Sequence, residues 1–259
     1  MTLTDDSPDT RPLSQQIADD LREAIRDGVY EPGSQLPSQR ALAQRYGAAR
    51  NTVTEALNIL SREGLVTSQQ GRGVFVREKQ TLIRLGNDRY SPKYREMGLS
   101  PFLLECARQG KRGRFEVLGI EKIKPTQELA KRLKVSPSTK SVLRRENVFY
   151  ADDDPVYRVT TWIPLAIARG SGLEQAEVPH QYGIHGVFEE KGHVMTRIDD
   201  EISARMPTPE ELSYLELPEG VPVIEVLHTS LDQDGDPYEV TLFVMRADMN
   251  GLRYNVPVE

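Results

Sequence analysis

The residues in this sequence whose types and spacing could do chemistry are polar groups suited to binding nucleic acid. Arg50, Asn51 and Thr52 open a stretch with a helical apolar period. In a DNA major groove an arginine can pair with guanine and an asparagine with adenine, while a threonine and the backbone amides at a helix start suit phosphate. Further along, Gly71 lets the backbone approach DNA closely and Arg72 can enter a minor groove. The alternative for each arginine is an ordinary solvated surface charge.

Two helices, a tight turn and a two-stranded wing are expected to position these side chains. Ser38 is a suitable N-cap for a short helix, Gly47 breaks the chain, and a second helix should run from 49 to 63. Gly64 stands where a helix C′ residue belongs, and the wing follows at 65–76. The apolar stripe of the second helix consists of Val53, Ala56, Leu57 and Leu60. This order is typical of a helix-turn-helix. An amphipathic hairpin for protein contacts is the alternative, but it leaves the glycine-rich wing unexplained.

A family resemblance rests on the runs PLSQQIADDLREAI, GVYEPGSQLPSQRALAQRYGAARNTVTEALNILSREGL and GRGVFV. Together they resemble the winged-helix domain of GntR-type bacterial repressors over residues 12–77. The resemblance implies that the DNA contacts come from Arg40, Arg50, Asn51, Thr52, Thr54, Gln70, Gly71 and Arg72. The family usually has arginine where Thr54 stands, so the operator is expected to differ from the family's usual GT…AC palindrome.

The distribution of charge agrees with DNA binding although the net charge is -6. Residues 12–37 contain two arginines and five acids, a balance of -3, whereas residues 38–77 contain six arginines and two glutamates, a balance of +4. Positive charge is therefore confined to the half that is expected to face DNA phosphates. The acidic remainder limits non-specific adhesion to nucleic acid.

Length and composition restrict the class of protein. With 259 residues and 38% hydrophobic content, the chain suits one large or two modest domains. No apolar stretch approaches the roughly 20 residues that span a bilayer, and the polar, acidic start does not resemble a signal peptide. Cys106 is the only cysteine, which fits a reducing, cytoplasmic location. The four histidines show no metal-ligand spacing, so neither a metal nor a cofactor is expected.

The second part of the chain has a mixed pattern of helices and strands. A shift of 82 residues superposes Thr126 on Thr208, Asp152 on Asp234 and Pro155 on Pro237. Each unit reads helix, strand, tight turn, strand, which indicates an internally duplicated α+β domain whose hairpins join one antiparallel sheet. Alternatively, hairpin turns share these residues simply because turns favour Asp, Gly and Pro. The expected organisation is a disordered N-terminus at 1–11, a winged helix at 12–77, a linker at 78–96 and an α+β domain at 97–259.

A second resemblance rests on LSPFLLECARQGKRGRFEVLGI, a hairpin ending in TTWIP, and YEVTLFVMRAD. These runs resemble the ligand-sensing UTRA domain of the HutC branch of GntR regulators, which implies a chorismate-lyase-like antiparallel sheet with flanking helices, a bound small-molecule effector and dimerisation. The candidate effector-binding residues are Phe102, Arg145, Asn147, Phe149, Tyr157, Glu239 and Arg246.

The effector site departs from the pattern of sugar-phosphate-sensing relatives. Their Ser/Thr-rich loop is replaced by residues 100–104, SPFLL, and Asn147 and Phe149 stand where an Arg-x-Arg pair is usual. The effector is therefore not expected to be a simple sugar phosphate. A register shift of two residues would restore Arg145 to the site and reopen anion binding. Glu239 and Arg246 match positions that close the site in relatives, although an exposed cross-strand ion pair is the alternative.

These inferences predict a transcriptional repressor that binds a pseudo-palindromic operator in double-stranded DNA as a homodimer and senses a small molecule. One alternative is a C-terminal domain that only dimerises. Another is a lyase-like enzyme, against which the sequence offers no nucleophile–base pair, metal cluster or phosphate loop.

Overall fold

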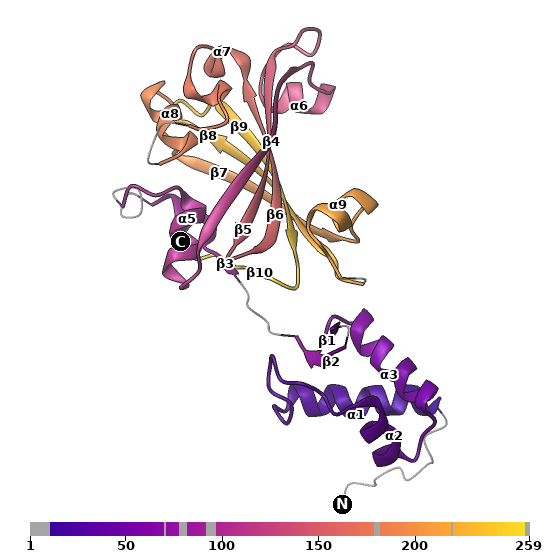
Figure 1. Ribbon diagram of the computed structural model, residues 1–259. Coiled ribbons are helices and arrows are strands. Elements are labelled where there is room, and N and C mark those ends of the chain that lie inside the picture. Colours follow the sequence, from indigo (N-terminus) through magenta and orange to yellow (C-terminus); the bar gives the residue numbers. More distant parts are fainter. Residues whose placement is uncertain are drawn as a thin grey trace, which may run out of the picture. The chain divides into compact units, whose positions relative to one another are not determined.

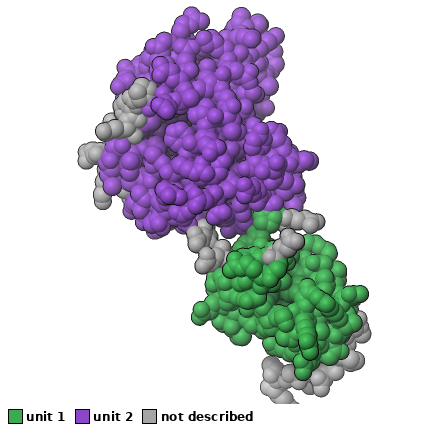
Figure 2. Space-filling model, in the orientation of Figure 1, with its two compact units in different colours: residues 1–80, 218–221 green, residues 81–217, 222–259 purple. Residues whose placement is uncertain are grey.

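The computed structural model describes residues 11–69, 71–77, 82–91, 97–178, 182–218 and 220–256, with the backbone alone at 87–88. The chain forms two compact units (Figure 2): Met1–Gln80 with Pro218–Val221, and Thr81–Leu217 with Pro222–Glu259. The N-terminus that we expected to be disordered lies outside the described residues, except for Arg11. Each unit has its own core and is described by itself.

The first unit is a winged helix. Ser38 caps the second helix by accepting a hydrogen bond from the Ala41 amide at 3.2 Å, and Gly47 ends that helix with a φ of 60°. The predicted apolar stripe of the third helix is fully buried in the core, which confirms its period. The elements (Figure 1) are α1 Leu13–Arg26, α2 Gln39–Tyr46, α3 Arg50–Arg62, β1 Val66–Gln69 and β2 Gly73–Val76.

The second unit is built on a six-stranded antiparallel sheet with the strand order β4-β5-β6-β9-β8-β7 (Figure 1). Its strands are β4 Gly113–Ile123, β5 Val142–Ala151, β6 Asp154–Pro164, β7 Arg197–Arg205, β8 Val223–Leu231 and β9 Pro237–Arg246. The helices around it are α5 Pro101–Arg108, α6 Gln127–Arg132, α7 Leu165–Ala168, η2 Gly172–Glu174, α8 Ile184–Glu190 and α9 Pro209–Tyr214. This α+β architecture agrees with the sequence prediction.

The internal repeat extends to details that turn composition does not explain. A shift of 82 maps α6 onto α9 residue for residue (127 to 209, 132 to 214). After each helix, a non-glycine residue takes up the left-handed conformation: Lys134 with a φ of 52°, and Glu216, 82 positions later, with a φ of 47°. The order β4-α6-β5-β6 recurs as β7-α9-β8-β9, and the two hairpins meet where β6 pairs with β9. The predicted joining of both hairpins in one antiparallel sheet is confirmed.

The segment that we expected to be a linker, 78–96, is in its described part a structural element of the second unit. Strand β3, Leu82–Arg84, pairs in parallel with β10, Asn250–Leu252, and the 3₁₀ helix η1, Gly86–Tyr90, follows. The linker prediction is wrong for residues 82–91 because they form a strand and a 3₁₀ helix in which Arg84 and Arg89 are buried and paired rather than solvated. Arg84 lies 3.5 Å from Asp200, and Arg89 lies 3.4 Å from Glu105. Residues 78–81 and 92–96 lie outside the described residues.

The repeated helix starts allow a matched test of stability. The Thr208 hydroxyl accepts the Glu211 amide at 3.3 Å, and the Glu211 carboxylate accepts the Thr208 amide at 2.8 Å, forming a capping box. We predict that Thr208→Ala lowers the free energy of unfolding of the second unit by about 1 kcal/mol. Denaturant unfolding followed by fluorescence of Trp162, the only tryptophan, reports on this unit alone.

Thr126→Ala is the matched comparison, because Thr126 caps α6 through a single bond to the Leu129 amide at 3.2 Å. Its cost should not exceed that of Thr208→Ala. An unchanged unfolding midpoint for Thr208→Ala would contradict a stabilising capping box.

Candidate functional site

Three arginines of the winged helix lack ion pairs within the described residues. Arg40, Arg50 and Arg72 are exposed, and none of them has an acidic partner within the described residues. Arg50 Nε donates to Gln39 Oε1 at 3.4 Å, and the Arg72 guanidinium lies 5.6 Å from the centre of the Phe75 ring. The arginines that are paired with acids in the same unit include Arg22, Arg26, Arg45 and Arg62. Free cations thus remain at the positions where phosphate contact is expected.

The start of α3 presents the other candidate residues. Asn51 is exposed and Thr52 is half-buried on the first turn. The Thr54 hydroxyl donates to the Arg50 carbonyl oxygen at 3.0 Å, so it is already engaged within its own helix. This bond leaves Arg50 and Asn51 as the more available base-reading groups.

The wing is held to the chain that precedes α2. Gln35 Nε2 donates to the Arg72 carbonyl oxygen at 2.6 Å, and Gln35 also forms a bridge with Phe75. A Cβ at Gly73 would lie 2.5 Å from Gln35 Nε2, so only glycine permits this approach. Gly71 is exposed at the turn with a φ of 74°, while Gln70 lies outside the described residues. The wing backbone at Arg72 and Gly73 is therefore held close to Gln35.

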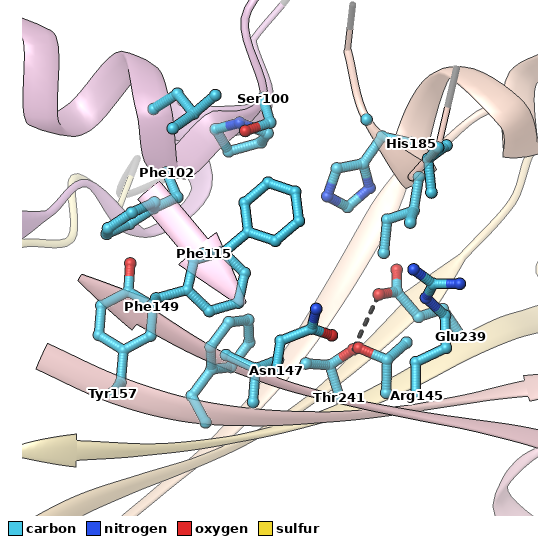
Figure 3. A pocket seen from close by; sticks show the side chains of 18 of the residues that line it. Ser100, Phe102, Phe115, Arg145, Asn147, Phe149, Tyr157, His185, Glu239 and Thr241 are labelled. Atoms are coloured by element: carbon cyan, nitrogen blue, oxygen red, sulfur yellow. Dashed lines mark hydrogen bonds between the residues drawn. The ribbon is translucent and has the colours of Figure 1, made fainter. Parts of the chain in front are cut away.

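The second unit contains a cavity of about 320 Å³ on one face of its sheet (Figure 3). Side chains from η1, α5, the start of α8 and the strands β4, β5, β6 and β9 line it. The size falls in the range of small-molecule sites. Of the seven candidate effector residues, the structure brings six together here: Phe102, Arg145, Asn147, Phe149, Tyr157 and Glu239.

Strand register gives the floor of the cavity a polar end and an apolar end. Across β5, β6 and β9, one row consists of Arg145, Thr161 and Thr241. The row two residues further along each strand contains both polar and apolar side chains. The row four residues from the first contains Phe149 and Tyr157. The side chains share one face because a strand alternates its faces every residue. Figure 3 shows the rings of Phe149 and Tyr157 on one side of the cavity, with Arg145 and Glu239 on the other.

Arg145 lies in the cavity without any shift of register. It shares a strand face with Asn147 and Phe149, whereas Arg144 points to the other face and pairs with Glu121. The Arg145 side chain is 3% exposed, and its guanidinium donates to the carbonyl oxygens of Leu173, of Gln175 at 2.7 Å and of Ala176 at 3.5 Å. Burial lowers the pKa of Arg145 to about 10, which leaves it charged at physiological pH.

Glu239 provides the negative charge at the same end of the cavity. It is 2% exposed, and it accepts hydrogen bonds from the hydroxyls of Ser230 at 3.1 Å and Thr241 at 2.8 Å. No cation lies within ion-pair distance of Glu239 in the described part of the chain. His185, also in the lining, does not supply one, because burial lowers its pKa to about 4 and keeps the ring neutral.

Arg246 does not belong to the cavity. Its side chain is 7% exposed, and it bonds to Asp248 at 2.9 Å and to the Leu215 carbonyl oxygen at 3.1 Å. It is therefore neither an effector-facing group nor half of an exposed pair with Glu239. The prediction that Arg246 faces the effector was wrong because the sequence does not reveal that Asp248, two residues later, pairs with the guanidinium.

Several lining residues were missed by sequence reasoning. Arg89 and Tyr90 come from the supposed linker, and His185 opens α8. The buried Nε and Nη1 atoms of Arg89, the Tyr157 hydroxyl and His185 Nδ1 have no hydrogen-bond partner within the described protein. The only sequence signal for Arg89 was its position in a segment with no period. Such a segment does not reveal whether a charge is buried or solvated.

A buried hydrogen-bond chain connects the cavity to β3. From Glu239 it passes to Ser230, then to His228 Nε2 at 3.1 Å. His228 Nδ1 lies 2.5 Å from Asp200, which also accepts the Tyr254 hydroxyl at 2.8 Å and faces Arg84. Although burial acts to raise the pKa of Asp200, the His228 bond and the nearby cations lower it well below its usual value. Hydrogen bonds thus connect Glu239 in the cavity to Asp200, which faces Arg84 on β3.

The fold and the two sites define a class of protein: a transcription regulator in which a DNA-binding winged helix is joined to a ligand-binding domain. The family described as bacterial regulatory proteins, gntR family, matches residues 13–76, and the UTRA domain matches residues 108–250. The chain belongs to the GntR family and has the HutC-type pairing of a GntR domain with a UTRA domain that the sequence predicted.

Relatives along the whole chain agree. The chain is 32% identical over 244 residues to an HTH-type transcriptional regulator of Rhizobium meliloti (strain 1021), covering 93% of each chain. It is 29% identical over 238 residues to the mannosyl-D-glycerate transport/metabolism system repressor MngR of Escherichia coli (strain K12), covering 92% of this chain and 93% of that one. The crystal structure of PhnF from Mycobacterium smegmatis, at 22% identity, has the same fold with a TM-score of 0.60, covering 94% of this chain and 100% of that one.

The family and these relatives are transcriptional regulators, so this chain is a DNA-binding regulator and not an enzyme. The lyase-like alternative is excluded. Among the described residues, no helix is both long and apolar enough to cross a bilayer.

The unpaired arginines lead to a prediction about DNA binding. Arg50→Ala should cost about 1–3 kcal/mol on an operator selected from a random DNA library, and less on unselected DNA, because a bidentate base contact is lost. Arg72→Ala should weaken binding to both DNAs alike, since a wing contact near the backbone carries little sequence information. Fluorescence anisotropy at fixed salt measures both effects.

Arg62→Ala is the control, since Arg62 lies on the same helix but is paired with Glu55 at 3.4 Å. It should leave both affinities close to those of the unmodified protein. Equal losses on operator and unselected DNA for Arg50→Ala would show a phosphate contact instead of a base contact.

Proposed function

We propose that this protein is a cytoplasmic repressor that binds a pseudo-palindromic operator as a homodimer and whose affinity for DNA is set by a small molecule in the cavity of the second unit. The observation that carries the proposal is the pair of buried, unmatched charges, Arg145 and Glu239, at the wall of a 320 Å³ cavity. Burying a charge without an opposite charge is costly, and a domain that only dimerises gains nothing from it.

The DNA-reading surface in this proposal consists of the exposed start of α3, Arg40 on α2 and the wing tip. Arg50 and Asn51 read bases in the major groove, Thr52 and the amides of the first turn contact phosphate, and Arg72 follows the minor groove. The absence of salt bridges at Arg40, Arg50 and Arg72 within the described residues supports this surface, because these cations need not break an ion pair to meet DNA. Gln70 is retained as a wing contact from the family resemblance alone.

Homodimerisation follows from the amount of sequence that one unit can read. A single recognition helix contacts only a few base pairs, which is too little for genomic specificity, and two-fold proteins read two-fold sites. We place the dimer contact in residues 97–259, as the UTRA resemblance implies.

A simple sugar phosphate fits this cavity poorly. Glu239 has no neutralising cation in the described protein, so it repels a phosphate dianion, while the rings of Phe102 and Phe149 offer no hydrogen bonds to sugar hydroxyls. The effector in this proposal combines an apolar part with a polar end.

The dimer can be tested on the full chain. Sedimentation should give twice the chain mass of 29.2 kDa, and a footprint on the selected operator should protect two half-sites related by a two-fold axis. A monomer that binds one unrepeated half-site tightly would contradict the proposal.

Filling the cavity tests the sensing function. Asn147→Trp should leave operator affinity intact but abolish its response to metabolites, because the indole occupies the middle of the floor. The measurement is anisotropy of labelled operator while a panel of amino acids, organic acids, nucleosides and sugar phosphates is added. At least one compound should shift the affinity of the unmodified protein. Thr160→Trp, on the opposite face of β6, is the control and should respond normally.

If no compound in a broad panel changes operator affinity, and Asn147→Trp behaves like the unmodified protein in every respect, the sensing function is wrong. The second unit would then serve dimerisation alone.

A further inference from the structure

The two ends of the cavity together define the chemistry of the ligand more closely than the proposed function requires. We infer that the effector is a zwitterion of the α-amino-acid type with an aromatic or large apolar side chain, with its ammonium group at Glu239, its carboxylate at Arg145 and its side chain against the aromatic rings. This inference rests on the proposed function, since it assumes that the cavity is the effector site.

The first step concerns Glu239. Its two oxygens accept one hydroxyl each, Oε2 from Ser230 and Oε1 from Thr241. These neutral donors stabilise the carboxylate but do not neutralise it, and no cation within the described residues lies within 4 Å of it. A ligand ammonium supplies both the missing charge and strong N–H donors. A second anion at this position would be repelled.

The second step concerns Arg145. Its guanidinium is anchored by the carbonyl oxygens of Leu173, Gln175 and Ala176, which fix its direction but carry no formal negative charge. It remains charged, buried and without a carboxylate partner in the part of the chain that the structure describes. A ligand carboxylate is the natural acceptor for the remaining N–H groups of a fixed guanidinium. The anchoring carbonyls pre-organise the cation, so little side-chain entropy is lost on binding.

The third step is that both charges lie at the same end of the cavity. Figure 3 shows Arg145 and Glu239 on the far side of Asn147 and Thr241 from the Phe149 ring. Between the two charges the floor is formed by Thr161 and Thr241, whose hydroxyls are 3.0 Å apart. Small polar side chains leave room there for a compact head group. One cation and one anion beside that space match a head group that carries both signs of charge, not one that carries either sign alone.

The fourth step concerns the opposite end. Phe102 packs edge-on against Phe149, with ring centres 4.9 Å apart, and Phe115 lies 5.5 Å from Phe149 on its other side. Tyr157 extends the cluster and its ring stacks with that of Phe149 at 5.4 Å. A flat apolar side chain buries area and stacks against these rings, and the unpartnered Tyr157 hydroxyl adds one polar group to this end. The cavity therefore fixes the order of the ligand, with both charges together and the apolar group away from them.

The test uses the full chain and three matched ligands. L-phenylalanine carries both charges, 3-phenylpropionate lacks the ammonium group, and 2-phenylethylamine lacks the carboxylate. L-tyrosine and L-tryptophan, each with its corresponding analogues, extend the series to larger rings. Isothermal calorimetry should show that at least one of the amino acids binds, and that each of its truncated analogues binds about ten-fold more weakly or worse, since each loses one charge-assisted contact. That amino acid should also shift operator affinity.

Charge-removing variants assign the contacts. In Glu239→Gln, which keeps the shape of the side chain, the amino acid should lose its advantage over the analogue without the ammonium group, so that their affinities become equal. Arg144→Gln is the matched control, because Arg144 neighbours Arg145 on β5 but faces away from the cavity and pairs with Glu121. Its affinity ratios should equal those of the unmodified protein. Thermal unfolding monitored by circular dichroism confirms that each variant is folded, and the ligand series on the unmodified protein does not depend on the variants.

Three outcomes would overturn the inference. Equal binding of 3-phenylpropionate and phenylalanine would assign a plain carboxylate, equal binding of 2-phenylethylamine would assign a plain amine, and tighter binding of glucosamine 6-phosphate than of any amino acid would assign a sugar phosphate. Silence of the whole aromatic series, while another compound in the metabolite panel shifts operator affinity, would also overturn it but would leave the proposed function standing. Silence of the entire panel would remove both.

Discussion

The antiparallel pairing of β6 with β9 is the contact on which the second unit depends. Each repeat provides three strands and one short helix, and on its own it leaves one edge of β6 or β9 without hydrogen-bond partners. Their mutual pairing satisfies both edges and makes a single six-stranded sheet. It also sets the cavity, because Thr161 from the first repeat meets Thr241 from the second, and Arg145 thereby lies on the same floor as Glu239. A slip of one residue would turn the cavity-lining side chains of one repeat to the opposite face.

The duplicated fold is symmetric in its backbone but not in its chemistry. The capped helices correspond residue for residue and the strands follow the same order, yet one repeat contributes Arg145 and the aromatic row while the other contributes Glu239. Equivalent positions thus carry unlike side chains around one cavity. A ligand bound across the junction of the repeats contacts both halves of the sheet, so its binding is coupled to the packing of the whole unit. The bonded chain from Glu239 through Ser230, His228 and Asp200 extends that coupling to Arg84.

Local signals in the sequence predicted the elements well, and tertiary partners account for what was missed. The stripe of α3 and the Thr208 helix start follow from rules that involve only neighbours along the chain, so they could be read directly. Counting along the strand placed Asn147 and Phe149 in the site but brought in Arg145 only through a shift of register, and it could not show that the loop after α7 would hold the guanidinium. Arg84 and Arg89 looked like solvated charges of a linker, because their ion-pair partners, Asp200 and Glu105, lie in other segments of the sequence. No periodicity reports such a pairing.

The parallel pairing of β3 with β10 has a consequence for synthesis of the protein. The two strands are separated by 168 residues (250 minus 82). At roughly 5–20 residues per second, a ribosome needs about 8–34 s to make the chain between them. The DNA-binding unit, completed apart from a short later segment before β3 emerges, is exposed during that interval, whereas the sensor lacks β9 and β10. If the messenger RNA is cleaved or the ribosome stalls during this interval, the polypeptide has a complete DNA-reading helix but an incomplete ligand-binding unit.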